Sequence, residues 1–176
     1  IDEVLKYAEL NPEVSLVQPR LMLYESPDVV NSLGNDTHFL GFGYCSAYKK
    51  KWSEVKDTFS ERIMYPAGAA ILFRVSQIEK IGLFDETLWM YNEDQDLGWR
   101  AWLAGFEVTL AKDSVVYHKY EFAKSIKQYY YMDRNRIIEI LKNYRLATIF
   151  LILPAFLVME MVLLLFSFLN GWFVEN

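Results

Sequence analysis

The sequence predicts an α/β fold followed by a membrane segment. Up to Tyr117, short apolar runs typical of buried strands alternate with segments whose apolar residues recur at helical spacing. Residues 147–169 are almost entirely apolar, and Glu160 is their only charge. At about 1.5 Å per residue this run is long enough to cross a bilayer core of about 30 Å. We therefore expect a folded α/β part attached to a membrane.

Composition limits the classes of function. The net charge of −5 argues against general nucleic-acid binding. Cys45 is the single cysteine, so no internal disulfide is expected. Hydrophobic residues make up 53% of the chain, and much of this excess lies after Leu146. The chain begins without Met and ends just past a hydrophobic run, so we expect it to be part of a longer protein.

The first third of the chain predicts one helix and two short strands. Residues 2–10 carry apolar side chains at helical spacing, and an Asn-Pro pair ends that helix. Residues 14–18 read as a buried strand that Pro19 limits, and residues 21–24 as a second extended piece. The polar, glycine-containing residues 26–51 are expected to be mostly loop, with room for one hairpin.

The middle of the chain predicts a strand, two helices and one or two further strands. Residues 67–73 are small and then apolar, as in a buried strand, and residues 75–81 form a short helix that Gly82 ends. A second helix is expected over residues 94–104. Residues 106–117 are β-rich, with Lys112 and Asp113 as a turn.

The segment before the apolar run predicts an amphipathic helix at the membrane interface. Over residues 125–144, bases outnumber acids and aromatic residues are frequent. An ordinary surface helix packed on its own domain is the alternative. The expected apolar face comprises Ile126, Tyr130, Ile137, Leu141 and Tyr144. The predicted divisions are residues 1–122 (α/β domain), 123–146 (interfacial helix), 147–169 (membrane segment) and 170–176 (tail).

The membrane segment carries two unusual residues. Pro154 would kink it or split it into a re-entrant pair, and a buried core helix is a further alternative. Glu160 is costly in a membrane unless it faces another helix or a polar lipid group. Bases precede the segment and none follow it, so residues 1–146 are expected on the cytoplasmic side.

The acidic stretch YNEDQDLGWR, residues 91–100, is the strongest candidate for a functional site. Carboxylates this dense repel one another unless a cation, a proton or a basic group is shared. If Asp94 caps the following helix, its carboxylate is ionised, directed and able to accept a proton from a hydroxyl group. Glu93 is a second polar contact to substrate. Asp96 and Arg100 are spaced to pair along the helix, and both are also candidates for substrate binding. An acidic helix N-terminus that only satisfies the helix dipole is the alternative.

Several further residues are weaker candidates. Gly68 allows close approach of a ligand to the backbone, with Ala69 beside it. Trp89 and Trp99 each offer a flat face for a sugar ring, with a core side chain as the alternative for both. His118, at the end of the strand VVYH, could bind a divalent cation or a diphosphate, although a lone histidine is often structural. Asp94 and Asp96 diverge by about 200° on a helix and are not expected to share a cation.

Four motifs in this order resemble the C-terminal half of family 2 glycosyltransferases. They are GAAILFRVSQIEKIGLFDE, YNEDQDLGWRAWLAGF, VVYH and YYYMDRNR, and they cover most of residues 66–136. The resemblance is to the rhamnosyltransferase and galactofuranosyltransferase-like branch. It implies a partial GT-A fold (the nucleotide-diphospho-sugar transferase fold) with a mixed α/β sheet.

The resemblance also implies roles for residues and ligands. Asp94 would be the catalytic base, Glu93 its acidic neighbour and His118 part of a metal and diphosphate site, while Gly68 and Ala69 would line the sugar pocket. The implied reaction is inverting transfer from a nucleotide-sugar to a glycan or lipid-linked acceptor, with Mg²⁺ or Mn²⁺ as cofactor and membrane lipids as further partners. The nucleotide-binding half and Asp-x-Asp motif of that family normally precede the matched region, and this chain has neither.

Two other functions stay open. In a polyprenyl-phosphate glycosyltransferase, the acceptor is a lipid phosphate that is already ionised and needs no strong base. A membrane-anchored binding or scaffolding domain would keep the fold without catalysis.

Overall fold

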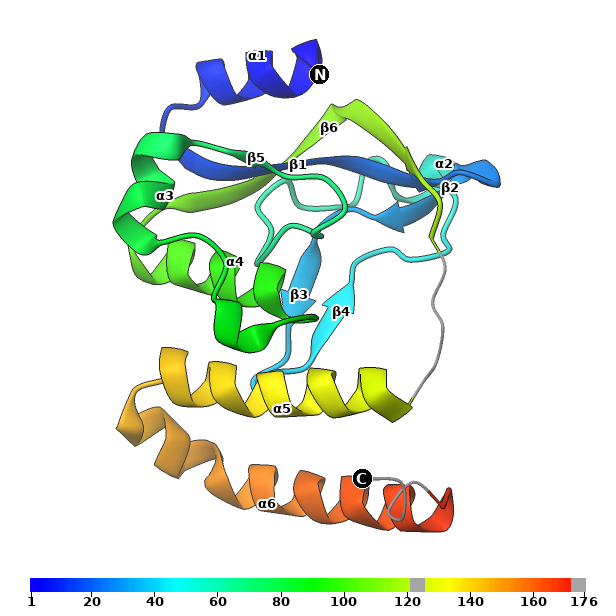
Figure 1. The fold of residues 1–176 in the computed structure, drawn as a ribbon. Coiled ribbons are helices and arrows are strands. Elements are labelled where there is room, and N and C mark those ends of the chain that lie inside the picture. The colour runs from blue at the N-terminus through cyan, green and yellow to red at the C-terminus, as the bar shows by residue number, and fades with distance from the viewer. Residues whose placement is uncertain (121–125, 172–176) are drawn as a thin grey trace.

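The computed structural model describes residues 1–120 and 126–171 as a mixed α/β domain followed by two long helices, α5 and α6 (Figure 1). The α/β prediction is confirmed. The first residues of the predicted interfacial helix, up to 125, and most of the predicted tail, from 172, lie outside the described residues.

Strand β1 (Val14–Leu23) is the centre of the sheet. On one edge it pairs in parallel with β6 (Glu107–His118). Along its other edge it pairs antiparallel first with β5 (Leu72–Phe73) and then with β2 (Ser26–Ser32). The sheet is therefore mixed, and every strand in it contacts β1.

The prediction that Pro19 ends the first strand is wrong. β1 continues through Pro19, and the ladder with β6 is irregular at that residue: Pro19 pairs with Ala111, but Arg20 pairs with Val115. The skipped residues of β6 include Lys112 and Asp113, so the predicted turn is a bulge inside one continuous strand. Proline has no N–H for the ladder, and a bulge opposite it accommodates that loss.

Residues 26–51 contain more strand than expected. The predicted hairpin is present as β3 (Asn35–Thr37) and β4 (Gly43–Cys45). However, β2 was expected to be loop. Its sequence SPDVVNS has an exposed polar start and a buried end, which is compatible with a strand at the edge of the sheet. The short helix α2 (Trp52–Val55) follows.

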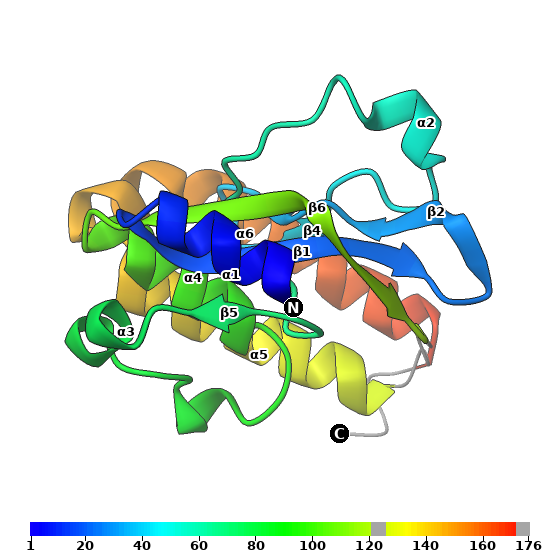
Figure 2. The same ribbon diagram turned by 90° about the horizontal axis from the view of Figure 1, so that it is seen from above.

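Helices cover both faces of the sheet, as the two ribbon views show (Figures 1 and 2). Helix α1 (Asp2–Leu10) lies on one face, where Val4 packs in a small cluster with strand residues. Helices α3 (Val75–Ile81) and α4 (Glu93–Leu103) lie toward the other face, joined by the short 3-10 helix η1 (Glu86–Leu88). The predicted helices over residues 2–10 and 75–81 are confirmed.

The predicted strand over residues 67–73 is wrong for most of its length, because only β5, its last two residues, pairs with the sheet. The backbone N–H of Ala67 donates instead to the Oε1 atom of Gln18, at 2.6 Å. Gln18 is fully buried on β1. A polar side chain in the central strand thus holds the start of this loop.

Helix α6 (Leu146–Leu169) runs back beside α5 (Ile126–Asn143) as a single helix with Pro154 inside it (Figure 1). Within the described ranges it alone is long and apolar enough to cross a membrane. No residue of α6 is buried, which argues against a buried core helix, and its continuity through Pro154 argues against a split re-entrant pair.

Glu160 of α6 has the helix partner that its position requires. Its carboxylate pairs with the Arg136 guanidinium on α5 at 2.5 Å. Arg136 is buried, lies over the rings of Phe42 and Phe156, and donates to the carbonyl oxygen of Leu40. One arginine thus joins α6, α5 and the β3–β4 connection.

Candidate functional site

The acidic stretch forms the first turn of α4. The helix begins at Glu93, and Asn92 is its N-cap residue with a left-handed backbone, φ +66°. Asp94 is therefore inside the first turn, and the expectation that it caps the helix is wrong. Its backbone N–H is one of the free donors of that turn, so the carboxylate still lies where the helix dipole favours a negative charge.

The Asp94 carboxylate is held from two sides. Its Oδ2 accepts a hydrogen bond from the backbone N–H of Gly68 at 2.8 Å, and its Oδ1 accepts from the backbone N–H of Gln95 at 2.8 Å. Burial raises the pKa of Asp94 to about 6; the Gly68 hydrogen bond opposes this rise and the charge of Glu93 adds to it. Asp94 is thus oriented, and it is a stronger base than an ordinary carboxylate.

Gly68 brings a distant loop to the acidic turn. A Cβ atom at Gly68 would lie 3.5 Å from Asp94 Oδ2 and 3.8 Å from Glu93 Oε1. Both carboxylates therefore face this glycine, and the structure brings Gly68 and Asp94 together. Ala69 follows in the same exposed turn.

Asp96 and Arg100 form the expected pair, with the Arg100 Nε atom 2.8 Å from Asp96 Oδ2. The other oxygen of Asp96 contacts the Lys142 ammonium of α5 at 2.9 Å, and Asp96 is fully buried. Arg100 also donates to the carbonyl oxygens of Ile81, Gly82 and Leu83. These contacts tie α4 to α5 and to the end of α3, so the pair has a structural role; its predicted contact with substrate is untested.

The two candidate tryptophans differ in position. Trp89 is 72% exposed and has φ +61°, so its ring lies on the surface next to the acidic turn. Trp99 is buried and packs edge-on against Tyr144 of the α5–α6 connection, with ring centroids 4.8 Å apart. Trp89 is the one available to stack on a sugar ring.

His118 ends β6, as predicted. Its Nδ1 lies 2.9 Å from Asn31 Oδ1, and its ring is 5.7 Å from that of Tyr120. Over residues 1–120 and 126–171, no group of three or more His, Cys, Asp or Glu side chains could hold a metal ion. The described residues therefore do not form the implied Mg²⁺ or Mn²⁺ site by themselves.

A buried carboxyl group from α5 completes the acidic turn, and sequence reasoning missed it. Glu139 is fully buried; its Oε2 accepts from Asn92 Nδ2 at 3.0 Å, and its Oε1 has no hydrogen-bond partner in the described structure. Burial raises the pKa of Glu139 to about 9, and the charges of Asp96 and Asp94 contribute to the rise. The sequence shows only that Glu139 lies four residues after Asn135, which places the two polar side chains on one face of a helix.

The raised pKa of Glu139 makes stability depend on pH. The folded protein keeps this proton up to about pH 9, whereas the unfolded chain loses it near the ordinary value of 4.5. Between these values the folded state binds more protons, so stability falls as pH rises. We expect Glu139→Gln, which never ionises, to melt at increasingly higher temperature than wild type from about pH 5 to about pH 9. Thermal unfolding across this range, with Glu54→Gln on α2 as control, measures the difference. Parallel curves for wild type and Glu139→Gln would contradict the raised pKa.

Helix α5 packs on the domain through its polar side. Gln128, Asn135, Arg136 and Glu139 are buried, whereas Tyr130 and Leu141 of the expected apolar face are exposed. This packing corresponds to the surface-helix alternative, although Ile140 is buried as well. A role of α5 at the membrane interface remains a prediction.

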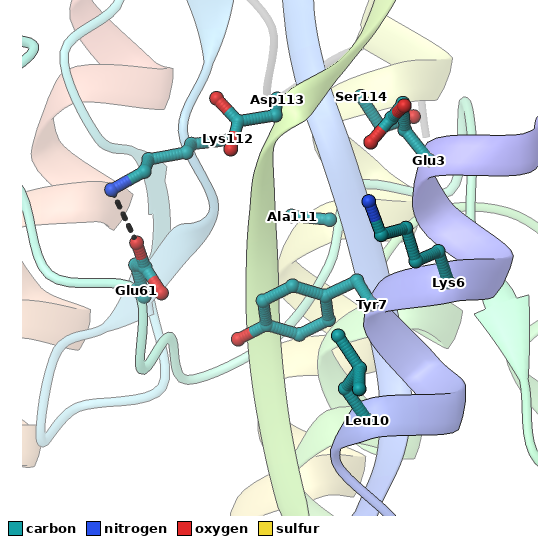
Figure 3. Close-up of a pocket in the computed structure, with 9 residues that line it drawn as sticks. All are labelled: Glu3, Lys6, Tyr7, Leu10, Glu61, Ala111, Lys112, Asp113 and Ser114. Atoms are coloured by element: carbon teal, nitrogen blue, oxygen red, sulfur yellow. Dashed lines mark ion pairs between the residues drawn. The ribbon is translucent and has the colours of Figure 1, made fainter.

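A separate cavity of roughly 300 Å³ lies between α1 and β6, lined by Tyr7, Lys112 and Asp113 among others (Figure 3). The Lys112 ammonium pairs with Glu61 at its rim, at 3.0 Å. This cavity is on the α1 side of the sheet and includes none of the predicted site residues.

Comparison with protein-family models and with curated proteins finds no match for this chain.

Proposed function

We propose that the protein is a membrane-anchored inverting glycosyltransferase in which Asp94 is the general base. The observation that carries the proposal is the Asp94 carboxylate, fixed by the Gly68 N–H at 2.8 Å and with its pKa raised to about 6. A base with a pKa near the working pH is mostly ionised and still takes up a proton readily. The resemblance to family 2 glycosyltransferases supplies the reaction class, and the mixed sheet is compatible with part of a GT-A fold.

In the proposed reaction, Asp94 removes the proton of an acceptor hydroxyl. The acceptor oxygen then attacks the anomeric carbon of the donor from the side opposite the nucleoside diphosphate. The carbon–oxygen bond to the diphosphate breaks, the diphosphate leaves with the bonding electrons, and the configuration at the anomeric carbon is inverted. The Mg²⁺ or Mn²⁺ implied by the resemblance remains a prediction.

Helix α6 supports a membrane-proximal acceptor. The exposed apolar surface of α6 would lie in lipid. Tyr130 and Leu141 of α5 are also exposed and would lie at the membrane interface. The exposed bases Lys127 and Arg145, before α6, favour the domain on the cytoplasmic side. We therefore propose a lipid-linked or membrane-bound glycan as the acceptor.

The direct test is transfer by the complete protein in lipid nanodiscs. A panel of UDP-, GDP- and dTDP-sugars is supplied with a polyprenyl-linked disaccharide, and release of nucleoside diphosphate is measured. We expect acceptor-dependent release with one donor, and NMR of the product should show the inverted anomer. A product with retained anomeric configuration would contradict a single displacement with Asp94 as base. Binding of a donor that does not depend on the acceptor, without any transfer, would favour a non-catalytic binding domain.

A further inference from the structure

The turn that leads into α4 has an unusual backbone. Trp89, Tyr91 and Asn92 all have positive φ angles, of +61°, +68° and +66°. None of them is glycine, so each conformation carries a steric cost that the surrounding structure must offset. Asp94 follows two residues later. Whatever holds this turn therefore also sets the direction of the proposed base.

Asn135 of α5 holds the turn by its backbone. Its single amide nitrogen, Nδ2, donates to the carbonyl oxygens of Leu88 at 2.8 Å, Met90 at 2.9 Å and Tyr91 at 2.7 Å. Asn135 is fully buried. The two N–H bonds of this amide are shared among the three carbonyl oxygens. These oxygens converge on it only while the turn keeps its positive φ angles, because an extended chain would point successive carbonyls apart.

Neighbouring contacts orient the Asn135 amide itself. Its Oδ1 accepts from the Arg134 guanidinium at 3.0 and 2.8 Å, so the Nδ2 side faces the turn. Arg134 also donates to the carbonyl of Thr87 at 2.7 Å. One helical turn further along α5, Glu139 accepts from the Asn92 side chain at 3.0 Å. Helix α5 therefore holds the turn at both its start and its end.

We propose that Asn135 is a positioning residue for the reaction, acting through the residue 88–92 turn on Asp94. This inference rests on the proposed function for its effect on catalysis. Asn135 need not touch either substrate, since its amide is fully used within the protein. Its loss should release the turn, displace the start of α4 and weaken the contact between Asp94 and Gly68. A displaced base lowers the rate of the bound complex more than it lowers affinity.

The experiment compares Asn135→Ala with Ile78→Ala in the complete protein in nanodiscs. Ile78 is a buried core residue of α3 whose truncation costs stability without touching the turn. We expect Asn135→Ala to lower kcat by about 100-fold with little change in KM. Ile78→Ala should keep kcat near wild type at a temperature where both variants are folded. Asn135→Ser, which keeps one hydroxyl donor, is the milder variant and should show a smaller loss in the same direction.

A second readout does not depend on transfer. Hydrogen exchange of a peptide covering residues 86–95 should be faster in Asn135→Ala than in wild type, and unchanged in Ile78→Ala. Unchanged exchange in this peptide, or a kcat loss no larger than that of Ile78→Ala, would overturn the positioning role. If Asp94→Asn retains transfer while exchange in Asn135→Ala is faster, the proposed base fails and the hold of Asn135 on the turn stands.

Discussion

Asp94→Asn is expected to lower transfer by about 100- to 10,000-fold, which is the usual range for loss of a general base. The asparagine has the same shape, and its single oxygen can still accept from the Gly68 N–H, which lies 2.8 Å from Asp94 Oδ2 in the wild type. Only the hydrogen bond from the Gln95 N–H is lost. Folding should therefore be preserved, and circular dichroism with thermal unfolding checks it. What the variant lacks is the negative charge and the capacity to take up a proton.

The pH profile gives an independent measure of the same group. Only ionised Asp94 can act as base, so wild-type kcat/KM should fall tenfold per pH unit below about pH 6, where burial places its pKa. The matched control is Asp28→Asn on the exposed start of β2, which should keep both rate and profile. Near wild-type transfer by Asp94→Asn would exclude Asp94 as base and favour a polyprenyl-phosphate acceptor, which is already ionised.

Gly98→Ala is expected to destabilise the protein by about 3 kcal/mol or more, because overpacking against backbone cannot be relieved by a side-chain movement. A Cβ at Gly98 would lie 2.3 Å from Tyr65 Cβ, 2.7 Å from its Cα and 2.8 Å from the carbonyl oxygen of Met64. This close approach holds α4 against the segment that leads into the Gly68 loop. The variant should also lose transfer, since the first turn of α4, which carries Asp94, would move away from the Gly68 loop.

The control for Gly98→Ala is Gly105→Ala, just after α4. Gly105 has φ +82°, but no heavy atom lies within 4 Å of a Cβ built there. Its cost is therefore the backbone strain alone, about 1 kcal/mol. Chemical denaturation of both variants in the same detergent measures the difference. Equal losses would show that the contact between α4 and residues 64–65 does not carry the expected stability.

Local patterns were sufficient for several elements. The helix over residues 75–81 was predicted with its terminating Gly82, which has φ +77° in the structure. The apolar run became α6, and the spacing of Asp96 and Arg100 predicted their ion pair. Each of these depends on side-chain periodicity or on residues four positions apart, so neighbouring sequence contains the required information.

The predicted strand boundaries were wrong where contacts with a distant segment outweighed the local sequence pattern. Pro19 is tolerated in the central strand because the ladder with β6 is irregular next to it, and no local pattern records that irregularity. Residues 67–71 have the composition of a strand, yet the start of this stretch bonds to Gln18 and to the Asp94 carboxylate. Long-range polar contacts thus overrode β propensity.

The acidic stretch and the apolar C-terminal run were determined by the sequence alone, because charge density and hydropathy are properties of contiguous residues. Only the tertiary structure decided which partners surround the carboxylates. Gly68 reaches Asp94 across 26 residues, and Glu139 reaches Asn92 across 47. Burial by these distant segments sets the two raised pKa values, and burial exists only once the chain has folded.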